Sequence, residues 1–133
     1  MGRTFPVIHL DANYLILGNQ KGSPEDAALN HWIASGRQLA TSSIAWMEFV
    51  SGPVPAPAVE SIRHALGDRI VAFSPRQAEL AASLYNVTGR RRALRYDCMI
   101  AAAAINSGAA LATRNLEDFR SFLPHGLQLA TRT

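Results

Sequence analysis

The stretch from Tyr96 to Phe119 constrains the fold of this chain more than any other part of its sequence. Residues 97–106 are rich in alanine and can form an apolar helix that packs close to neighbouring backbone. Gly108 can end this helix, because glycine takes the left-handed conformation at a helix end without a steric penalty. The apolar run 109–112 follows directly and has the length expected of a fully buried strand. The stretch therefore predicts a helix that leads straight into a buried strand.

The rest of the chain continues this alternation of short apolar strands and helical runs. Strands are predicted at residues 7–10, 38–41, 69–73 and 109–112, with 126–129 as a candidate edge strand. Helices are predicted at residues 14–17, 24–35, 44–50, 58–66, 75–88 and 97–106, and Asn115 is a suitable N-cap for a further turn. We therefore expect a parallel α/β sheet with helices on both faces, in a single domain that covers residues 1–133.

Composition limits the setting in which such a domain can work. A hydrophobic fraction of 48% can supply a continuous core, and a charged fraction of 17% argues against disorder. No apolar run approaches the roughly 20 residues that span a bilayer, so we expect no membrane contact. Cys98 is the single cysteine, which excludes an internal disulfide and fits the reducing cytoplasm. The net charge of +3 is carried almost entirely by arginine and gives weak support for an acidic partner.

Three carboxylates lie where either a local structural role or a functional site would place them. Asp11 follows the predicted strand 7–10, and Asp97 opens the predicted helix 97–106. Taken alone, each is better explained as a helix N-cap, which is the commoner role. Glu48 lies among large apolar residues, where exposure and burial with a partner are about equally compatible with the pattern. Burial without a partner would cost several kcal/mol, and a bound metal ion would remove that penalty.

Two further polar residues, Asn115 and Asp118, follow the predicted strand 109–112 and could also form a capping pair. If the strands are parallel, the groups after strands 7–10 and 109–112 reach the same edge of the sheet. Such a site would contain mostly oxygen ligands, which suit Mg²⁺, or Mn²⁺, better than zinc. An acidic metal site in a basic protein suggests a polyanionic substrate, whose phosphate the metal would polarise while it activates water.

Four short motifs resemble those of the PIN-domain ribonucleases, and in particular the VapC-type toxins of bacterial toxin–antitoxin pairs. They are residues 11–16, Glu48 with Gly52, residues 97–102 and residues 113–119, in the usual order and spacing. The resemblance implies a PIN-like three-layer fold with a parallel sheet of four to five strands. It also implies a Mg²⁺-dependent endoribonuclease toxin in which Asp11, Glu48 and Asp97 bind the metal. A homodimer and a small cognate antitoxin, whose tail occupies the acidic groove, are the implied protein partners.

The resemblance is looser at the fourth acid of the site. In many relatives an aspartate stands where this chain has Asn115, and here Asp118 follows one helical turn later, so either could complete the site. Thr113 matches a polar position beside the site, whereas Ala12 replaces a common threonine or serine. Asn13 belongs to the first motif and is expected beside the substrate.

The arginine-rich segment before Asp97 has two possible interpretations. The four arginines of this segment could bind substrate phosphates at the rim of the site, or they could belong to a solvated loop, since charge runs usually face water. They are Arg90, Arg91, Arg92 and Arg95. A groove for an amphipathic antitoxin segment could involve Leu29, Trp32 and Ile33.

Other functions remain open from the sequence. A related nuclease could act on DNA or a structured nucleic acid, although the short chain lacks obvious insertions to grip a duplex. A non-catalytic module could instead use its basic loop to bind nucleic acid or a partner, with the acids serving as caps. A phosphatase or a receiver domain also places acids after parallel strands, but it does not need Glu48 on an apolar helix.

Overall fold

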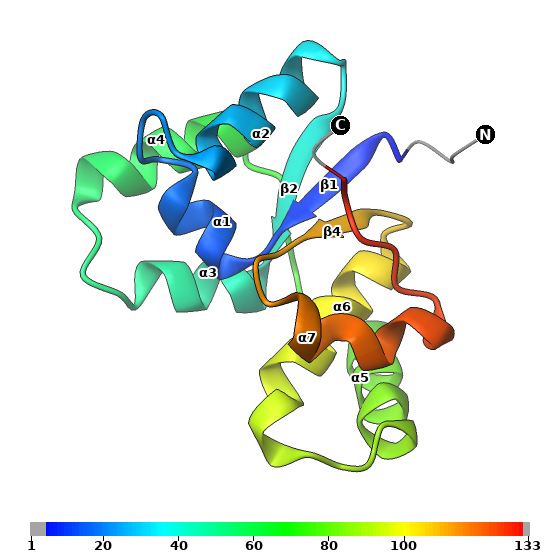
Figure 1. The fold of residues 1–133 in the computed structure, drawn as a ribbon. Coiled ribbons are helices and arrows are strands. Elements are labelled where there is room, and N and C mark those ends of the chain that lie inside the picture. The colour runs from blue at the N-terminus through cyan, green and yellow to red at the C-terminus, as the bar shows by residue number, and fades with distance from the viewer. Residues whose placement is uncertain (1–4, 132–133) are drawn as a thin grey trace.

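The computed structural model describes residues 5–131 and is built around one parallel sheet (Figure 1). Its strands are β1 (Val7–Leu10), β2 (Gln38–Ser42), β3 (Ile70–Val71) and β4 (Ala110–Ala112). They are ordered β3-β2-β1-β4, and every pairing between them is parallel. The predicted fold class, a parallel α/β sheet covered by helices, is therefore confirmed.

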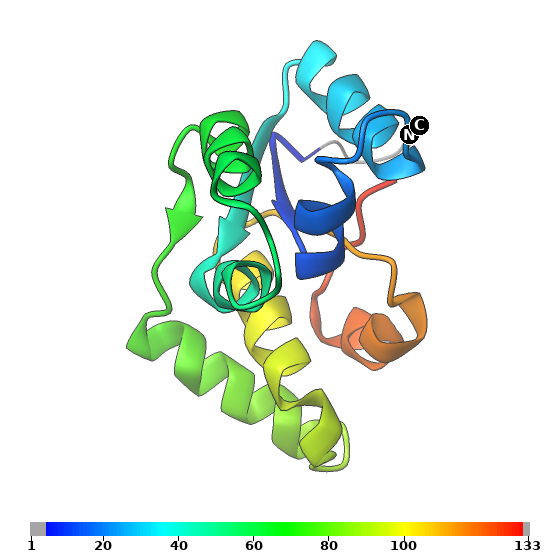
Figure 2. The ribbon, with the colours of Figure 1, turned by 90° about the vertical axis from the view of Figure 1, so that its left-hand side faces the viewer.

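Helices connect the strands and form the outer layers. They are α1 (Ala12–Leu17), α2 (Pro24–Ala34), α3 (Ser43–Val50), α4 (Ala56–Leu66), α5 (Pro75–Val87), α6 (Arg95–Asn106) and α7 (Leu116–Phe119). Two short 3₁₀ helices, η1 (Arg92–Leu94) and η2 (Arg120–His125), precede α6 and follow α7. Helices α1, α2 and α4 lie on one side of the sheet, and α6 and α7 lie on the other, with α5 packed outside α6 (Figures 1 and 2). Among residues 5–131, no helix is long and apolar enough to cross a membrane.

Local sequence explains where several helices begin. Ser23 and Ser74 each accept a hydrogen bond from the backbone of the first turn, and Pro24 and Pro75 follow at the first helical position. A proline is tolerated there because its missing N–H would have no partner inside the helix. These two starts agree with the sequence-based expectation.

The core lies between α6 and the sheet and between the sheet and α1 and α2. The run from Ile100 to Ala104 in α6 is buried, and its alanines allow the helix to approach the strands closely. On the other side, Trp32 is completely buried and stacks on Tyr14, with ring centroids 6.0 Å apart. A layer of buried side chains therefore packs on each side of the sheet.

Several predicted boundaries were wrong, among them the starts of α1 and α4, which lie two residues earlier than expected. Strand β3 is shorter than 69–73, because only Ile70 and Val71 pair with β2 and Ser74 already caps the next helix, α5. Helix α6 begins at Arg95, two residues before the expected start. The candidate edge strand 126–129 is reduced to a single parallel bridge between Leu111 and Leu129, since the preceding 3₁₀ helix continues to His125.

Candidate active site

Asp11 lies at the carboxyl end of β1 and is only 4% exposed. Its Oδ1 accepts a hydrogen bond from the Ala12 backbone at 2.8 Å, so it caps α1 as expected. Its Oδ2 accepts a second hydrogen bond, from the Thr113 hydroxyl at 2.7 Å. Asp11 can therefore act as a helix cap and as a site residue at once, because one carboxylate oxygen caps α1 while the other binds Thr113, the residue that follows β4.

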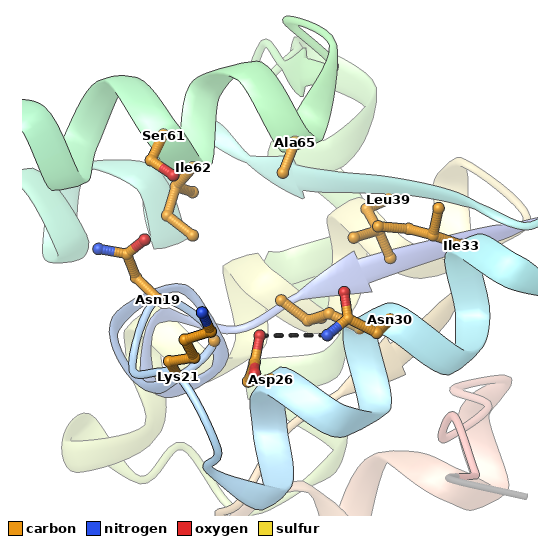
Figure 3. Close-up of a pocket in the computed structure, with 11 residues that line it drawn as sticks. Asn19, Lys21, Asp26, Asn30, Ile33, Leu39, Ser61, Ile62 and Ala65 are labelled. Carbon is orange, nitrogen blue, oxygen red and sulfur yellow. Dashed lines mark hydrogen bonds between the residues drawn. The ribbon is translucent and has the colours of Figure 1, made fainter.

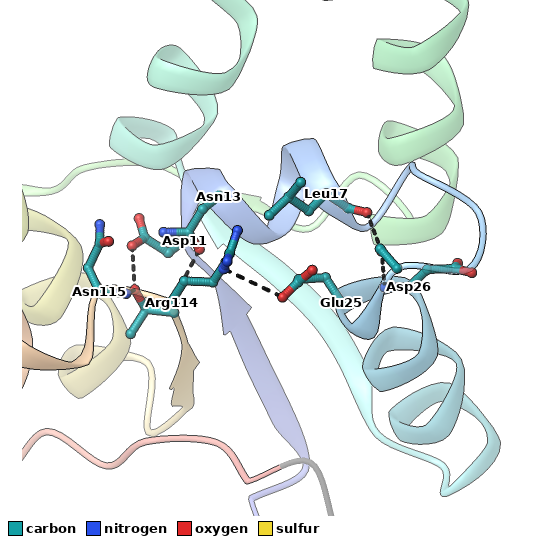
Figure 4. Close-up of polar contacts among 9 residues, drawn as sticks. Asp11, Asn13, Leu17, Glu25, Asp26, Arg114 and Asn115 are labelled. Atoms are coloured by element: carbon teal, nitrogen blue, oxygen red, sulfur yellow. Dashed lines mark hydrogen bonds and ion pairs between the residues drawn. The ribbon is translucent and has the colours of Figure 1, made fainter.

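The segment after β4 is held against the start of α1 by a short series of polar contacts (Figure 4). The Asn115 backbone N–H donates to the Thr113 hydroxyl oxygen at 3.0 Å, and the Arg114 backbone N–H donates to Asn13 Oδ1 at 3.2 Å. The Asp11 backbone N–H also donates to the Ala112 carbonyl oxygen at 3.0 Å. Two segments far apart in the sequence thus meet at one edge of the sheet, as the parallel arrangement predicts.

Glu48 and Asp97 approach the same edge from helices α3 and α6, and both are half-buried. Burial is the largest cause that raises the pKa of Asp97 from 3.8 to about 7, and the negative charges of Asp11, Asp118 and Glu48 account for the rest of the rise. Burial also raises the pKa of Glu48, as does the charge of Asp11. Asp97 is therefore close enough to the other three carboxylates for their charges to act on it, although the four come from separate elements.

The structure changes the interpretation of Asp97. The N-cap of α6 is Leu94, whose side chain makes no capping hydrogen bond, and Asp97 stands inside the first turn. Its carboxylate is therefore not the helix cap that the sequence favoured. A half-buried acid without that role, surrounded by other acids, is better explained by a functional site.

Asp118 lies close enough to Asp11 and Asp97 for its charge to act on both of them. The charge of Asp118 raises the pKa values of both Asp11 and Asp97. Asn115 occupies the N-cap position of α7 but makes no side-chain cap, so the predicted capping pair with Asp118 is not formed. We refer to Asp11, Glu48, Asp97 and Asp118 as the acid cluster.

The donors of the acid cluster fit a hard divalent cation in their chemistry, since all are carboxylates that repel one another. Asp97 shows this most clearly, because three neighbouring negative charges oppose its ionisation. Within the described part of the chain, however, no three His, Cys, Asp or Glu side chains stand close enough to enclose an ion. The side chains of the acid cluster would have to turn inward to hold one.

The predicted phosphate-binding arginines Arg92 and Arg95 form no ion pair with the acid cluster in the described part of the chain. Arg95 lines an apolar groove between α5 and α6 together with Cys98 and Met99, which share its face of α6. Arg92 is exposed in η1. Arg91, in the same arginine-rich segment, donates from Nη2 to the Ser121 hydroxyl oxygen at 3.1 Å. The geometry therefore gives no direct support to Arg92 or Arg95 as clamps at the acids.

One contact near the site was missed by the sequence analysis. Glu25, in the first turn of α2, is almost fully buried and forms an ion pair with Arg114, which flanks Thr113 (Figure 4). In the sequence, Glu25 looks like an ordinary acid in the first turn of a helix. Only its burial in the folded chain distinguishes it.

Parallel strands that bring carboxylates from separate elements to one edge define an α/β domain with an acidic site. Residues 8–122 match the PIN domain, and the chain belongs to the PIN domain family. The resemblance proposed from the four motifs is thereby confirmed at the level of the family. Among curated protein sequences, none matches this chain significantly.

Several solved structures share the fold. A chain of a toxin–antitoxin complex from Klebsiella pneumoniae is 26% identical, with a TM-score of 0.72 over 96% of this chain and 98% of that one. A chain of VapBC-1 from nontypeable Haemophilus influenzae is 18% identical, with a TM-score of 0.70 over 95% and 98%. A chain of VapBC2 from Rickettsia felis, bound to a promoter DNA fragment, is 21% identical, with a TM-score of 0.67 over 93% and 97%.

Proposed function

We propose that this chain is a Mg²⁺-dependent endoribonuclease and the toxin of a toxin–antitoxin pair, working in the cytoplasm. The observation that carries the proposal is the acid cluster, in which the charges of three neighbours raise the pKa of Asp97. Membership of the PIN domain family and similarity to a Klebsiella pneumoniae toxin–antitoxin chain support it.

A divalent cation, Mg²⁺ or Mn²⁺, would be held by Asp11, Glu48 and Asp97 and would supply charge neutralisation and activation of water for attack on a phosphodiester. Asp11 is the most firmly placed of these acids, since both of its oxygens accept hydrogen bonds. Asp118 adds negative charge beside Asp11 and Asp97. Thr113 and Asn13 fix the two backbone segments that flank Asp11, so both act as positioning residues.

The central test replaces one acid of the cluster. Asp97→Asn keeps the size of the side chain but removes the charge, and we expect cleavage of single-stranded RNA with Mg²⁺ or Mn²⁺ to fall at least about a hundredfold. Glu117→Gln is a matched control, because Glu117 is an exposed acid beside Asp118 that pairs with Arg120 at 2.9 Å. Unchanged cleavage by Asp97→Asn would contradict the proposal.

Two alternatives make different predictions in the same experiment. A nuclease specific for DNA or for structured nucleic acid would cleave those substrates faster than single-stranded RNA in parallel assays. A non-catalytic binding module would bind RNA equally well with and without EDTA and would cleave nothing at any metal concentration. The convergence of the acids on one edge favours catalysis, because helix caps alone do not require it.

A pocket between α2 and α4 is a suitable place for part of the antitoxin (Figure 3). Leu29, Ile33 and Ile62 line its apolar part, and Lys21 and Asp26 lie at its polar side. Trp32 does not contribute, since it is completely buried and its indole N–H donates to the Thr131 carbonyl oxygen. Ile33→Asp should weaken antitoxin binding and leave RNA cleavage unchanged.

Light scattering of the purified chain would test the expected homodimer.

A further inference from the structure

Arg114 is the arginine nearest in sequence to the residues that hold Asp11, and its side chain is fixed by an unusual partner. Its Nε lies 3.7 Å from Glu25 Oε2, where the arginine side chain is 56% exposed and the glutamate side chain only 5%. The other ion-paired arginines among residues 5–131 have exposed partners, Glu60 for Arg63 and Glu117 for Arg120. Exposed pairs of that kind contribute little orientation, whereas a buried carboxylate gives a fixed anchor.

The backbone beneath Arg114 is fixed as well. Its N–H donates to Asn13 Oδ1, and the hydroxyl of the preceding Thr113 donates to Asp11 Oδ2. Figure 4 shows the Arg114 side chain running from this turn, past Asn13, toward Glu25 and α2. A half-exposed guanidinium group thus extends from the turn that holds Asp11, and its ion pair is with Glu25 rather than with a carboxylate of the acid cluster.

An RNA strand that enters the acid cluster meets four negative charges and needs a positive group close by. Arginine's planar fork binds phosphate oxygens through two hydrogen bonds, which fixes the position of the strand as well as attracting it. Arg92 and Arg95 do not meet this need, since one lies in η1 and the other lines the groove between α5 and α6. Arg114 is attached to the same turn that positions Asp11.

We propose that Arg114 binds a phosphate of the substrate strand next to the acid cluster and so sets the position of the strand along the site. This proposal rests on the proposed RNA-cleaving function and adds a substrate-binding residue to it. The phosphate is that of a neighbouring nucleotide, because the side chain points away from Asp11 and toward α2 (Figure 4).

The test measures RNA binding separately from cleavage. A fluorescein-labelled single-stranded RNA is titrated in EDTA, which prevents cleavage, and anisotropy is followed over a series of KCl concentrations. For Arg114→Ala we expect the Kd to rise about tenfold, as for loss of one charge-assisted hydrogen-bonded contact. The slope of log K against log salt should become shallower by about 0.7, which corresponds to one phosphate contact fewer.

Arg120→Ala is the matched control. It removes the same charge from a neighbouring exposed arginine, and we expect its Kd to stay within about twofold of the unaltered protein, since a rim charge without a phosphate contact acts only at long range. Equal losses in Arg114→Ala and Arg120→Ala would show a general charge effect and overturn the proposal.

A structural role for the ion pair must be separated from a role in binding. Arg114→Ala leaves the Glu25 carboxylate without its arginine, so this variant can lose stability for reasons unrelated to RNA. The double variant Glu25→Gln with Arg114→Ala removes both charges of the ion pair. Its melting temperature should return toward that of the unaltered protein, while its Kd for RNA should remain about tenfold higher. Recovery of RNA affinity together with stability would mean that Arg114 is only structural.

Cleavage assays on the unaltered protein separate the role proposed for Arg114 from the proposed nuclease function. If the unaltered protein cleaves RNA and the double variant has the same KM, the role assigned to Arg114 is wrong and the nuclease proposal stands. If the unaltered protein neither binds nor cleaves RNA, both are wrong.

Discussion

At the scale of single residues, the site depends on how Asp11 is held. Its carboxylate is buried, and burial raises its pKa, while the hydrogen bond from Thr113 lowers it. The Thr113 hydroxyl makes two hydrogen bonds, because its oxygen also accepts one from the Asn115 backbone N–H. One hydroxyl therefore joins an acid of the site to the turn that follows β4.

Thr113→Val should separate the shape of this side chain from its hydroxyl. The variant leaves a buried carboxylate with one hydrogen bond fewer and a backbone N–H without its acceptor. We expect a loss of about 2 kcal/mol in the free energy of unfolding, the usual range for a hydrogen bond to a charged group. The rate of RNA cleavage should fall at least tenfold if a similar free energy is lost in the transition state, since about 1.4 kcal/mol of activation free energy corresponds to a tenfold change in rate.

Thr113→Ser is the control, because it keeps the hydroxyl. Urea denaturation and single-turnover cleavage would measure both quantities. Equal stability and activity of the valine and serine variants would show that the hydrogen bond to Asp11 is unimportant.

At the scale of elements, strands β1 and β4 were predictable because each is a short apolar run that is followed by a polar residue. The start of α6 was not predictable in this way. Its N-cap is Leu94, a buried residue with no capping side chain, so packing rather than a local polar signal fixes where the helix begins. Asp97 looked like the cap only because it is the first suitable residue in the sequence.

The same helix shows how closely α6 packs. Ala102 is completely buried in the middle of the helix, and Leu at this position would have to displace neighbouring side chains or backbone. Ala102→Leu should therefore reduce the free energy of unfolding by about 1 to 3 kcal/mol, although leucine is itself a good helix former.

Asn106→Leu at the exposed end of α6 is the control for this substitution, and it should change stability by less than about 0.5 kcal/mol. Chemical denaturation of both variants would measure the difference. If Ala102→Leu were as stable as the control, the helix would not be packed as tightly as the structure indicates.

At the scale of the whole molecule, the acid cluster draws its members from the ends of β1 and the starts or faces of α3, α6 and α7. The parallel strands allow the sequence to predict that Asp11 and the segment after β4 meet. The pairing of Glu25 with Arg114 could not be foreseen, because it depends on how α2 packs beside the end of β4. Local patterns indicate elements and their polarity, whereas pairings between surfaces of distant elements need the packed fold.

This arrangement places several negative charges together, and the whole fold should respond to their neutralisation. The pKa of Asp97 is about 7 in the folded chain, against an ordinary value of 3.8. At Asp97 the folded state therefore binds more protons than the unfolded state between these values, so the contribution of Asp97 to stability should be greatest below about pH 4 and should fall as pH rises to about 7. Because Asp97 is only half-buried, we expect this fall to be about 1 to 2 kcal/mol, well below the full value of the shift.

A divalent cation should reverse this loss when the carboxylates are ionised. In EDTA, the contribution of Asp97 should lower the melting temperature of the protein between pH 5 and pH 8. Added Mg²⁺ should raise the melting temperature more at pH 8 than at pH 5, because protons compete for the same oxygens at pH 5. Asp97→Asn should show a weaker dependence on both pH and Mg²⁺, since the side chain that titrates has been removed. Thermal melts of the two proteins at both pH values, with and without Mg²⁺, measure these differences. A gain from Mg²⁺ that is the same at both pH values, or the same in Asp97→Asn, would show that the acid cluster is not where the cation acts.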